Sequence, residues 1–284
     1  MSVTTSTCSL ASLRVNEPLA GTAVESVDRW LLLEVTDVWA PKVLQTEALS
    51  PQVRDRLAAW TAEGSRARLK LIRRPGRSGK RTLFAVVSSE GRAASVELDR
   101  FEDLLDLDLD TVRTDESNPM LLVCVHGRRD RCCAKHGSAL YRALHSQVDE
   151  VWQTSHLGGH RFAACALSLP DGFMYGRVRP EHSDRMAAAL RAREVVDLDL
   201  LRGRCSHDRP TQAAEIFARR RTGEVSIDGF DWLGTTDNGP EAWTVRFRSA
   251  AGEHSLDVRL EQTGAVRAAS CNAEPEAWAS FVEA

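Results

Sequence analysis

The sequence predicts an α/β (α+β) fold, with two units of mixed strands and helices followed by a small β-rich C-terminal extension. Three observations lead to this class. Strand and helix patterns follow one another before residue 100, the order β, α, β, loop, β, β, α runs through residues 120–190, and alternating strand patterns follow Glu224. Interleaved strand and helix patterns are typical of domains that pack helices on a sheet.

The first unit begins with an apolar run at residues 30–35 that is typical of a buried strand. A helix is predicted from Ser50-Pro51, because a cap and a proline in the first turn precede apolar residues at helical spacing up to Gly64. Residues 68–73, 82–87 and 94–98 are the strands expected to complete this unit.

The second unit opens with a predicted buried strand at residues 120–125. A helix is expected to begin near Gly137, with apolar residues at every fourth position up to Val148, before a short strand at 152–155. Two further strands, 162–169 and 173–178, flank Pro170-Asp171-Gly172. Asp-Gly between two strand-like runs is a strong hairpin signal.

A helix over residues 180–190, with Met186 and Leu190 facing inward, ends the second unit's pattern. The acidic stretch 104–119 is the predicted linker, which gives an N-terminal α/β domain at 1–115, a second domain at 116–222 and a β-rich extension at 223–284. Strands are expected in the extension at 243–248 and 256–260, without chemistry of their own. Both halves share a strand, helix, hairpin order, which suits an old duplication.

Composition argues against several classes of function. The chain has 284 residues, 43% hydrophobic content and a net charge of −3, as in ordinary soluble proteins. Arg73-Arg74 and Arg219-Arg220-Arg221 are short basic runs without interleaved aromatic residues, so we expect solvated surface and no nucleic-acid partner. No run approaches the about 20 apolar residues needed to cross a membrane, and residues 1–12 lack a secretory pattern. A cytoplasmic location is the expectation.

Residues 124–160 carry two pairs of side chains of the types that bind metals. Cys124 ends a predicted strand, and Cys133 follows a polar loop with eight residues between the two thiols. Further on, His156-Leu-Gly-Gly-His160 places two imidazoles after another strand, with three residues between them. The glycine pair disfavours a helix and allows positive φ, so a tight loop is expected to turn both rings toward one centre.

Four thiolate and imidazole donors are the number that an iron–sulfur cluster needs, and histidine pairs replace cysteine pairs in Rieske centres. A structural Cys2His2 zinc site is an alternative, although structural zinc motifs place their thiols about 2–4 residues apart. A thiol-based oxidoreductase is another, motivated by adjacent Cys132 and Cys133, but no Cys-x-x-Cys motif occurs.

The remaining cysteines and histidines show no pattern of their own. Seven cysteines are an odd number, so a complete disulfide framework is not expected. The default for four of the thiols is a small buried apolar residue. The default for three histidines is a polar residue without a special role, and the alternative is a group that supports the metal ligands. These residues are Cys8, Cys165, Cys205 and Cys271, and His126, His136 and His207.

Several segments together resemble the sucrase/ferredoxin-like family. The N-terminal Pro18-Leu-Ala-Gly-Thr22 and the first predicted strand add to this likeness, which spans roughly Cys8 to Arg220. The motifs are Cys124-Val-His-Gly-Arg-Arg-Asp-Arg-Cys-Cys133, Ser155-His-Leu-Gly-Gly-His160-Arg-Phe-Ala, Tyr175-Gly-Arg177-Val and Gln212-Ala-Ala-Glu215.

The resemblance implies a thioredoxin-like ferredoxin domain with a [2Fe–2S] cluster and an electron-transfer function, an electron carrier more than a catalyst of substrate turnover. The implied ligands are Cys124, Cys133, His156 and His160, with Cys133 taken over Cys132 because the family spacing places eight residues between the thiols. The "sucrase" in the family name gets no support, since the motif region holds no acidic pair suited to glycoside hydrolysis.

Ligand charge has consequences for such a site. Two neutral imidazoles in place of two thiolates are expected to raise the reduction potential and to couple electron transfer to protons. The expected partners are a redox donor and acceptor that the sequence does not identify. Charged residues flank the ligands and are candidates for hydrogen bonds to them or for a docking face toward an acidic partner, with solvated surface charges as the alternative: Arg128, Arg129, Asp130, Arg131 and Arg161.

Overall fold

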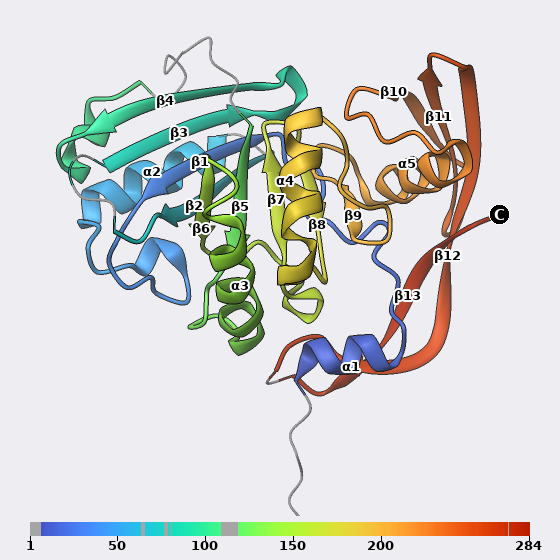
Figure 1. Ribbon diagram of the computed structural model, residues 1–284, viewed down its shortest axis with the longest axis horizontal. Coiled ribbons are helices and arrows are strands. Elements are labelled where there is room, and N and C mark those ends of the chain that lie inside the picture. The colour runs from blue at the N-terminus through green and yellow to red at the C-terminus, as the bar shows by residue number, and fades with distance from the viewer. Residues whose placement is uncertain (1–6, 64–65, 77–78, 80, 109–118, 272) are drawn as a thin grey trace, which may run out of the picture.

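The computed structural model describes residues 7–63, 66–76, 79, 81–108, 119–271 and 273–284. A nine-stranded mixed sheet forms the centre of the fold, and a separate four-stranded antiparallel sheet lies at the C-terminal end (Figure 1). The strand orders are β4-β3-β1-β2-β6-β5-β7-β8-β9 and β10-β11-β12-β13. The predicted α/β fold class is confirmed.

The first half supplies one side of the large sheet. Its elements are β1 (Arg29–Glu34), η1 (Val43–Gln45), α2 (Pro51–Glu63), β2 (Ala67–Arg73), β3 (Arg81–Val87), η2 (Ser88–Glu90), β4 (Arg92–Leu98) and η3 (Phe101–Leu105). Strands β1 and β2 are parallel and joined through α2, whereas β3 and β4 add an antiparallel hairpin. In β1, Leu31 packs on the α2 side and Trp30 on the opposite side, as a strand buried on both faces requires.

The second half repeats this arrangement. Its elements are β5 (Met120–Cys124), α3 (Arg131–Leu144), β6 (Val151–Thr154), η4 (His160–Phe162), β7 (Ala166–Leu169), β8 (Phe173–Tyr175), η5 (Pro180–His182) and α4 (Ser183–Ala192). Strands β5 and β6 are parallel, and β7 and β8 form the hairpin predicted from Asp171-Gly172, where Gly172 has φ +77°. The expected order of strands and helices is confirmed.

The two halves meet at the centre of one continuous sheet. Strand β2 pairs antiparallel with β6 through Ile72 opposite Thr154 and Arg73 opposite Gln153. From this junction outward, the strand orders β2-β1-β3-β4 and β6-β5-β7-β8 are alike, as the shared pattern of the two halves suggested. Most of the predicted linker, residues 109–118, lies outside the described residues, and the division into three domains stays a prediction.

Helix α3 begins six residues earlier than the sequence indicated, because Asp130 caps it by accepting a hydrogen bond from the Cys132 backbone nitrogen at 2.8 Å. Gly137 lies inside the helix, at the point where α3 approaches the end of β5. A Cβ there would collide with the Cys124 carbonyl oxygen. The glycine that resembled a helix start is therefore a close-packing residue, and Val148 lies beyond the helix end at Leu144.

The C-terminal region adds elements that the sequence analysis did not anticipate. They are β9 (Leu201–Arg204), α5 (Arg209–Thr222), β10 (Asp231–Asp237) and β13 (Pro275–Glu283), beside the expected β11 (Ala242–Ser249) and β12 (Gly252–Ala268). Helix α5 packs between β9 and the small sheet. The long β12 extends away from that sheet toward α1 (Cys8–Arg14), as Figure 1 shows.

The basic run Arg219-Arg220-Arg221 is only partly at the surface. Arg219 has no exposed side-chain area and pairs with Glu215 at 2.9 Å, so the expectation of a solvated run is wrong for this residue. Its guanidinium lies where α5 covers the Phe173 and Phe230 rings, while Arg220 is exposed. None of the helices in the described ranges is long and apolar enough to cross a membrane.

Candidate metal centre

Three of the four predicted ligands converge at one edge of the sheet. Cys124 ends β5, Cys133 lies in the first turn of α3, and His156 follows β6. Because β5 and β6 are parallel neighbours, their carboxyl ends open at the same edge. The His156 Nδ1 lies 3.7 Å from the Cys133 sulfur and 4.0 Å from the Cys124 sulfur. These are distances at which three donors surround a single point.

The fourth predicted ligand, His160, lies beside this group but outside it. Its ring stacks on that of His156 with centroids 5.0 Å apart and an interplanar angle of 26°. Gly158 and Gly159 have φ of +95° and +68°, as the expected tight loop requires. The His160 Nδ1 is buried without a hydrogen-bond partner among the described residues. An unpaired buried nitrogen on a ring stacked against His156 is suited to metal ligation.

Two basic residues from distant strands hold the histidine loop, and the sequence analysis missed both. Lys70 Nζ donates to the His156 carbonyl oxygen at 2.6 Å, and Arg202 Nη1 donates to the Gly158 carbonyl oxygen at 3.0 Å. A Cβ on Gly159 would collide with the Arg202 guanidinium. Burial lowers the pKa of Lys70 to about 8. Neither residue belongs to a local motif, so spacing gave no signal for them.

His126 also fixes this loop. Its Nδ1 accepts a hydrogen bond from the His156 backbone nitrogen at 3.3 Å, and its ring meets Trp39 edge to face at 5.8 Å. Burial lowers the pKa of His126, which favours the neutral ring that this hydrogen bond needs. The expectation that His126 has no special role is therefore wrong, because the fold brings it beneath a predicted ligand.

The protonation states of the two thiols in the first group depend on each other. A hydrogen bond from the Cys133 thiol holds the pKa of Cys124 well below its usual value, and the same contact raises the pKa of Cys133. One thiolate is thus already favoured in this pair. Metal ligation requires thiolates, so binding at this group would release the remaining proton.

A second group of donors lies nearby, which the sequence analysis did not foresee. Cys8 in α1, Cys132 in α3 and Cys271 between β12 and β13 bring their sulfurs together with the Asp130 carboxylate. The Cys8–Cys132, Cys132–Cys271 and Cys271–Cys8 sulfur distances are 3.6, 3.4 and 3.6 Å. The default of isolated buried residues is wrong for Cys8 and Cys271, and the C-terminal extension does carry a side chain able to bind a metal.

The adjacent cysteines of α3 therefore face different groups. Cys133 lies with Cys124 and His156, whereas Cys132 lies with Cys8 and Cys271. The hydrogen bond from the Cys8 thiol lowers the pKa of Cys132 to about 4. The other two cysteines are buried in the hydrophobic core, as expected, and all seven are free thiols: Cys165 and Cys205 complete the set.

Asp130 belongs to the second group and also lies near the histidine loop. Its carboxylate accepts from the backbone nitrogens of Cys132 at 2.8 Å and Cys271 at 3.0 Å, and His160 Nε2 lies 3.9 Å from it. Of the other charged residues that flank the ligands in sequence, Arg128, Arg129 and Arg131 are exposed. The fifth, Arg161, is paired with Glu17 at 2.8 Å and is not free to serve as a docking residue.

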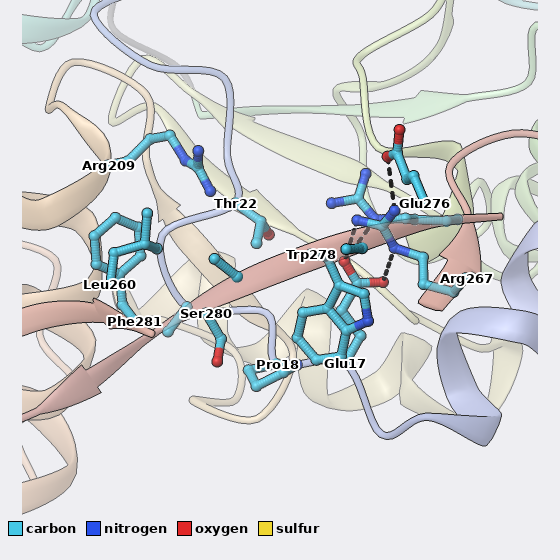
Figure 2. Close-up of a pocket in the computed structure, with 14 residues that line it drawn as sticks. Glu17, Pro18, Thr22, Arg209, Leu260, Arg267, Glu276, Trp278, Ser280 and Phe281 are labelled. Atoms are coloured by element: carbon cyan, nitrogen blue, oxygen red, sulfur yellow. Dashed lines mark hydrogen bonds and ion pairs between the residues drawn. The ribbon is translucent and has the colours of Figure 1, made fainter. Parts of the chain in front are cut away.

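A cavity of about 320 Å³ lies between the N-terminal segment and the small sheet. Figure 2 shows Glu17 and Arg267 at its wall, with Glu276 on the far side of the arginine and Arg209 at the opposite end. Glu17 joins Arg267 at 2.9 Å and also holds Arg161, the residue after His160. This ion network ties the segment after the histidine loop to β12.

The large mixed sheet, with thiol and imidazole donors at the ends of its central strands, defines an α/β protein with Cys/His groups able to bind a metal. A model of the sucrase/ferredoxin-like family matches residues 19–203, which is more than half of the chain and includes all four predicted ligands. The chain therefore belongs to the sucrase/ferredoxin-like family. No curated protein and no solved structure matches it significantly.

Proposed function

We propose that the protein is an electron carrier that holds a [2Fe–2S] cluster on Cys124, Cys133, His156 and His160. One observation carries this proposal. The sulfurs of Cys124 and Cys133 both lie within 4.0 Å of His156 Nδ1, and the neighbouring His160 has an unpaired Nδ1. Thiolate and imidazole are the donors that such clusters use, and membership of a ferredoxin-like family agrees with them. When bound, the cluster accepts and releases single electrons.

Electrons would leave and enter the proposed cluster through its histidine ligands, which lie closer to solvent than its cysteine ligands. Cys124 and Cys133 are 1% and 2% exposed, whereas the His160 side chain keeps 15% of its area in contact with solvent. Lys70, Arg202 and His126 hold the loop between the rings and so limit its rearrangement between redox states. A site that changes shape little on reduction transfers electrons with a small reorganisation cost.

Two histidine ligands make the potential higher than that of an all-cysteine cluster, because two negative charges are removed from the site. They also make it depend on pH. A ligating imidazole keeps a second nitrogen that binds a proton more tightly in the reduced state. The potential then falls as pH rises above the oxidised-state pKa, by up to about 59 mV per pH unit for one proton and one electron.

Three exposed arginines supply a surface for redox partners. Arg128, Arg129 and Arg131 lie between the two cysteine ligands in sequence and remain exposed. A positive patch beside a redox site attracts acidic partners and orients them, so we propose an acidic protein as donor or acceptor. We further propose a cytoplasmic location, since all seven cysteines are free thiols and reducing compartments preserve thiols.

A mononuclear zinc site is the second candidate. The Cys124, Cys133 and His156 donors lie within 4.8 Å of one another, and a single tetrahedral ion binds Cys2His2 sets. In a two-iron cluster, by contrast, the cysteine and histidine pairs belong to different irons. The iron, sulfide and zinc contents of the purified protein distinguish the two candidates.

The deciding experiment is anaerobic purification of the full chain, followed by iron, acid-labile sulfide and zinc analysis with visible and EPR spectroscopy. We expect a red-brown protein with iron and sulfide in equal amounts and a reduced EPR signal of low average g. His156→Ala should lose the colour, whereas Cys205→Ala, which changes a cysteine outside both groups, should keep it. A colourless protein with zinc at these four residues would refute the cluster.

A further inference from the structure

We propose that Cys8, Cys132, Cys271 and Asp130 form a second metal site, which binds one Zn²⁺ and is separate from the proposed cluster. The four residues come from α1, the start of α3 and the connection between β12 and β13. Cys8 and Cys271 are 263 positions apart, so their convergence depends on the whole fold. Both lie outside the residues that the family model matches.

The distances between the sulfurs favour a single ion. Two thiolates bound to one tetrahedral Zn²⁺ at about 2.3 Å lie about 3.8 Å apart, close to the 3.4 to 3.6 Å observed here. A disulfide joins sulfurs at about 2.05 Å, and any pairing among three cysteines leaves one thiol over. The three thiols are thus arranged as ligands around a common centre.

Asp130 completes a tetrahedral set. Its Oδ1 lies 3.3 Å from the Cys271 sulfur and 3.9 Å from the Cys8 sulfur. Hydrogen bonds from the Cys132 and Cys271 backbone nitrogens fix the carboxylate and favour its ionised form. Thiolate and carboxylate are both donors that zinc accepts, and four of them complete its tetrahedral coordination.

Neighbouring groups support the ligands. Ser9 Oγ lies 3.3 Å from the Cys132 sulfur, and the positive charge of Arg131 lies near enough to Cys271 to interact with it. Contacts of this kind orient ligands and offset the excess negative charge of a thiolate-rich site. Cys8, Asp130 and Cys132 are buried, and Cys271 is half-buried, as expected of a site that holds its ion for structural purposes.

Zinc at this site would join both ends of the chain to the helix that carries Cys133. Helix α1 packs against η4 and β12, and η4 begins at His160. Binding to the folded state alone stabilises that state by mass action. The second site would therefore hold the surroundings of the proposed cluster without taking part in electron transfer.

The test compares zinc and iron in the full chain and its variants. Cells are grown with zinc, and the protein is purified anaerobically and dialysed. We expect one zinc per chain, and X-ray absorption at the zinc edge should show three sulfur ligands at about 2.3 Å and one oxygen at about 2.0–2.2 Å. Cys8→Ser and Cys271→Ser should lose the zinc and keep the iron, whereas Cys271→His, which supplies another zinc ligand, should retain zinc.

Two further variants separate this site from the proposed cluster. Cys124→Ser should lose iron and keep one zinc, and Cys205→Ala should keep both metals. The full chain could instead contain two zinc ions and no iron, and Cys271→Ser could lose one of the two. That result would refute the cluster and support this second site. The second site is refuted by a full chain that takes up no zinc, by undiminished zinc in both serine variants, by iron in its place, or by a disulfide among these three cysteines.

Discussion

The two histidines of the His156-Leu-Gly-Gly-His160 segment direct their nitrogens at different neighbours. His156 Nδ1 faces the sulfurs of Cys124 and Cys133, whereas His160 has an unpaired Nδ1 and places its Nε2 3.9 Å from Asp130. His160 thus links the proposed cluster to the carboxylate of the second donor group. As a proposed ligand, His160 would be the one that lies nearest a carboxylate.

Replacing His160 tests this role. In His160→Cys, a thiolate adds negative charge next to the cluster and removes one protonatable ring, so the midpoint potential should fall and its pH slope should become shallower. Potentiometry from pH 6 to 9 measures both quantities. His145→Cys, an exposed histidine beyond the opposite end of α3, is the matched control. A potential and slope equal to those of the unchanged chain would remove His160 from the ligand set.

At the scale of elements, the contact between α3 and β5 sets the distance between the two cysteines of the proposed ligand set. Cys124 ends β5 and Cys133 lies in the first turn of α3. Gly137 allows the helix to approach the Cys124 carbonyl oxygen. The close packing at Gly137 therefore lets α3, which carries Cys133, lie against the end of β5, which carries Cys124.

Gly137→Ala should push α3 away from β5. Helix propensity alone predicts that alanine stabilises the helix by about 1 kcal/mol, but overpacking at this contact costs about 1–3 kcal/mol. We expect a net loss of stability in urea unfolding and less iron per chain. Lys135→Ala, at an exposed position of the same helix, should leave both unchanged. A stabilised variant with full iron content would contradict the packing role of Gly137.

At the scale of the whole molecule, Glu215 joins the large sheet to the C-terminal region. It is buried in α5 and pairs with Arg219 at 2.9 Å and with Arg204 of β9 at 3.4 Å. Burial alone would raise its pKa, but the Arg204 and Arg219 charges outweigh burial and lower the pKa from 4.5 to about 2. The ionised carboxylate therefore stabilises the folded chain.

The stabilisation by Glu215 depends on pH with a definite sign. It is fully present above about pH 4.5 and is lost as pH falls toward 2, because the unfolded chain then binds the proton more readily. The difference between the two pKa values corresponds to about 3 kcal/mol. In urea unfolding between pH 3 and 7, the stability deficit of Glu215→Gln should thus shrink as pH falls.

The control for this measurement is Glu253→Gln, an exposed partner of Arg248 with 57% of its side chain accessible. A surface pair of this kind contributes at most about 1 kcal/mol, so its removal should change little at any pH. A Glu215→Gln deficit that stays constant from pH 3 to 7 would show that the buried charge has no part in stability.

The sequence by itself determined most of the elements and the first donor group. Apolar runs, Asp171-Gly172 and the Gly158-Gly159 pair act over a few residues, and short-range patterns specify strands, hairpins and tight loops. Short-range patterns also identified Cys124 and the two histidines as candidate donors. They failed at the start of α3, where the cap of Asp130 and the packing of Gly137 together set the boundary.

Only the tertiary structure decided which residues surround those donors. Lys70 reaches His156 from 86 positions away, Cys271 reaches Cys132 from 139 positions away, and Arg219 is buried although its neighbour Arg220 is exposed. Such contacts depend on how strands and helices pack, which residue spacing in one sequence does not encode. The sequence therefore specified the donors of one site, and the fold alone brought together the second.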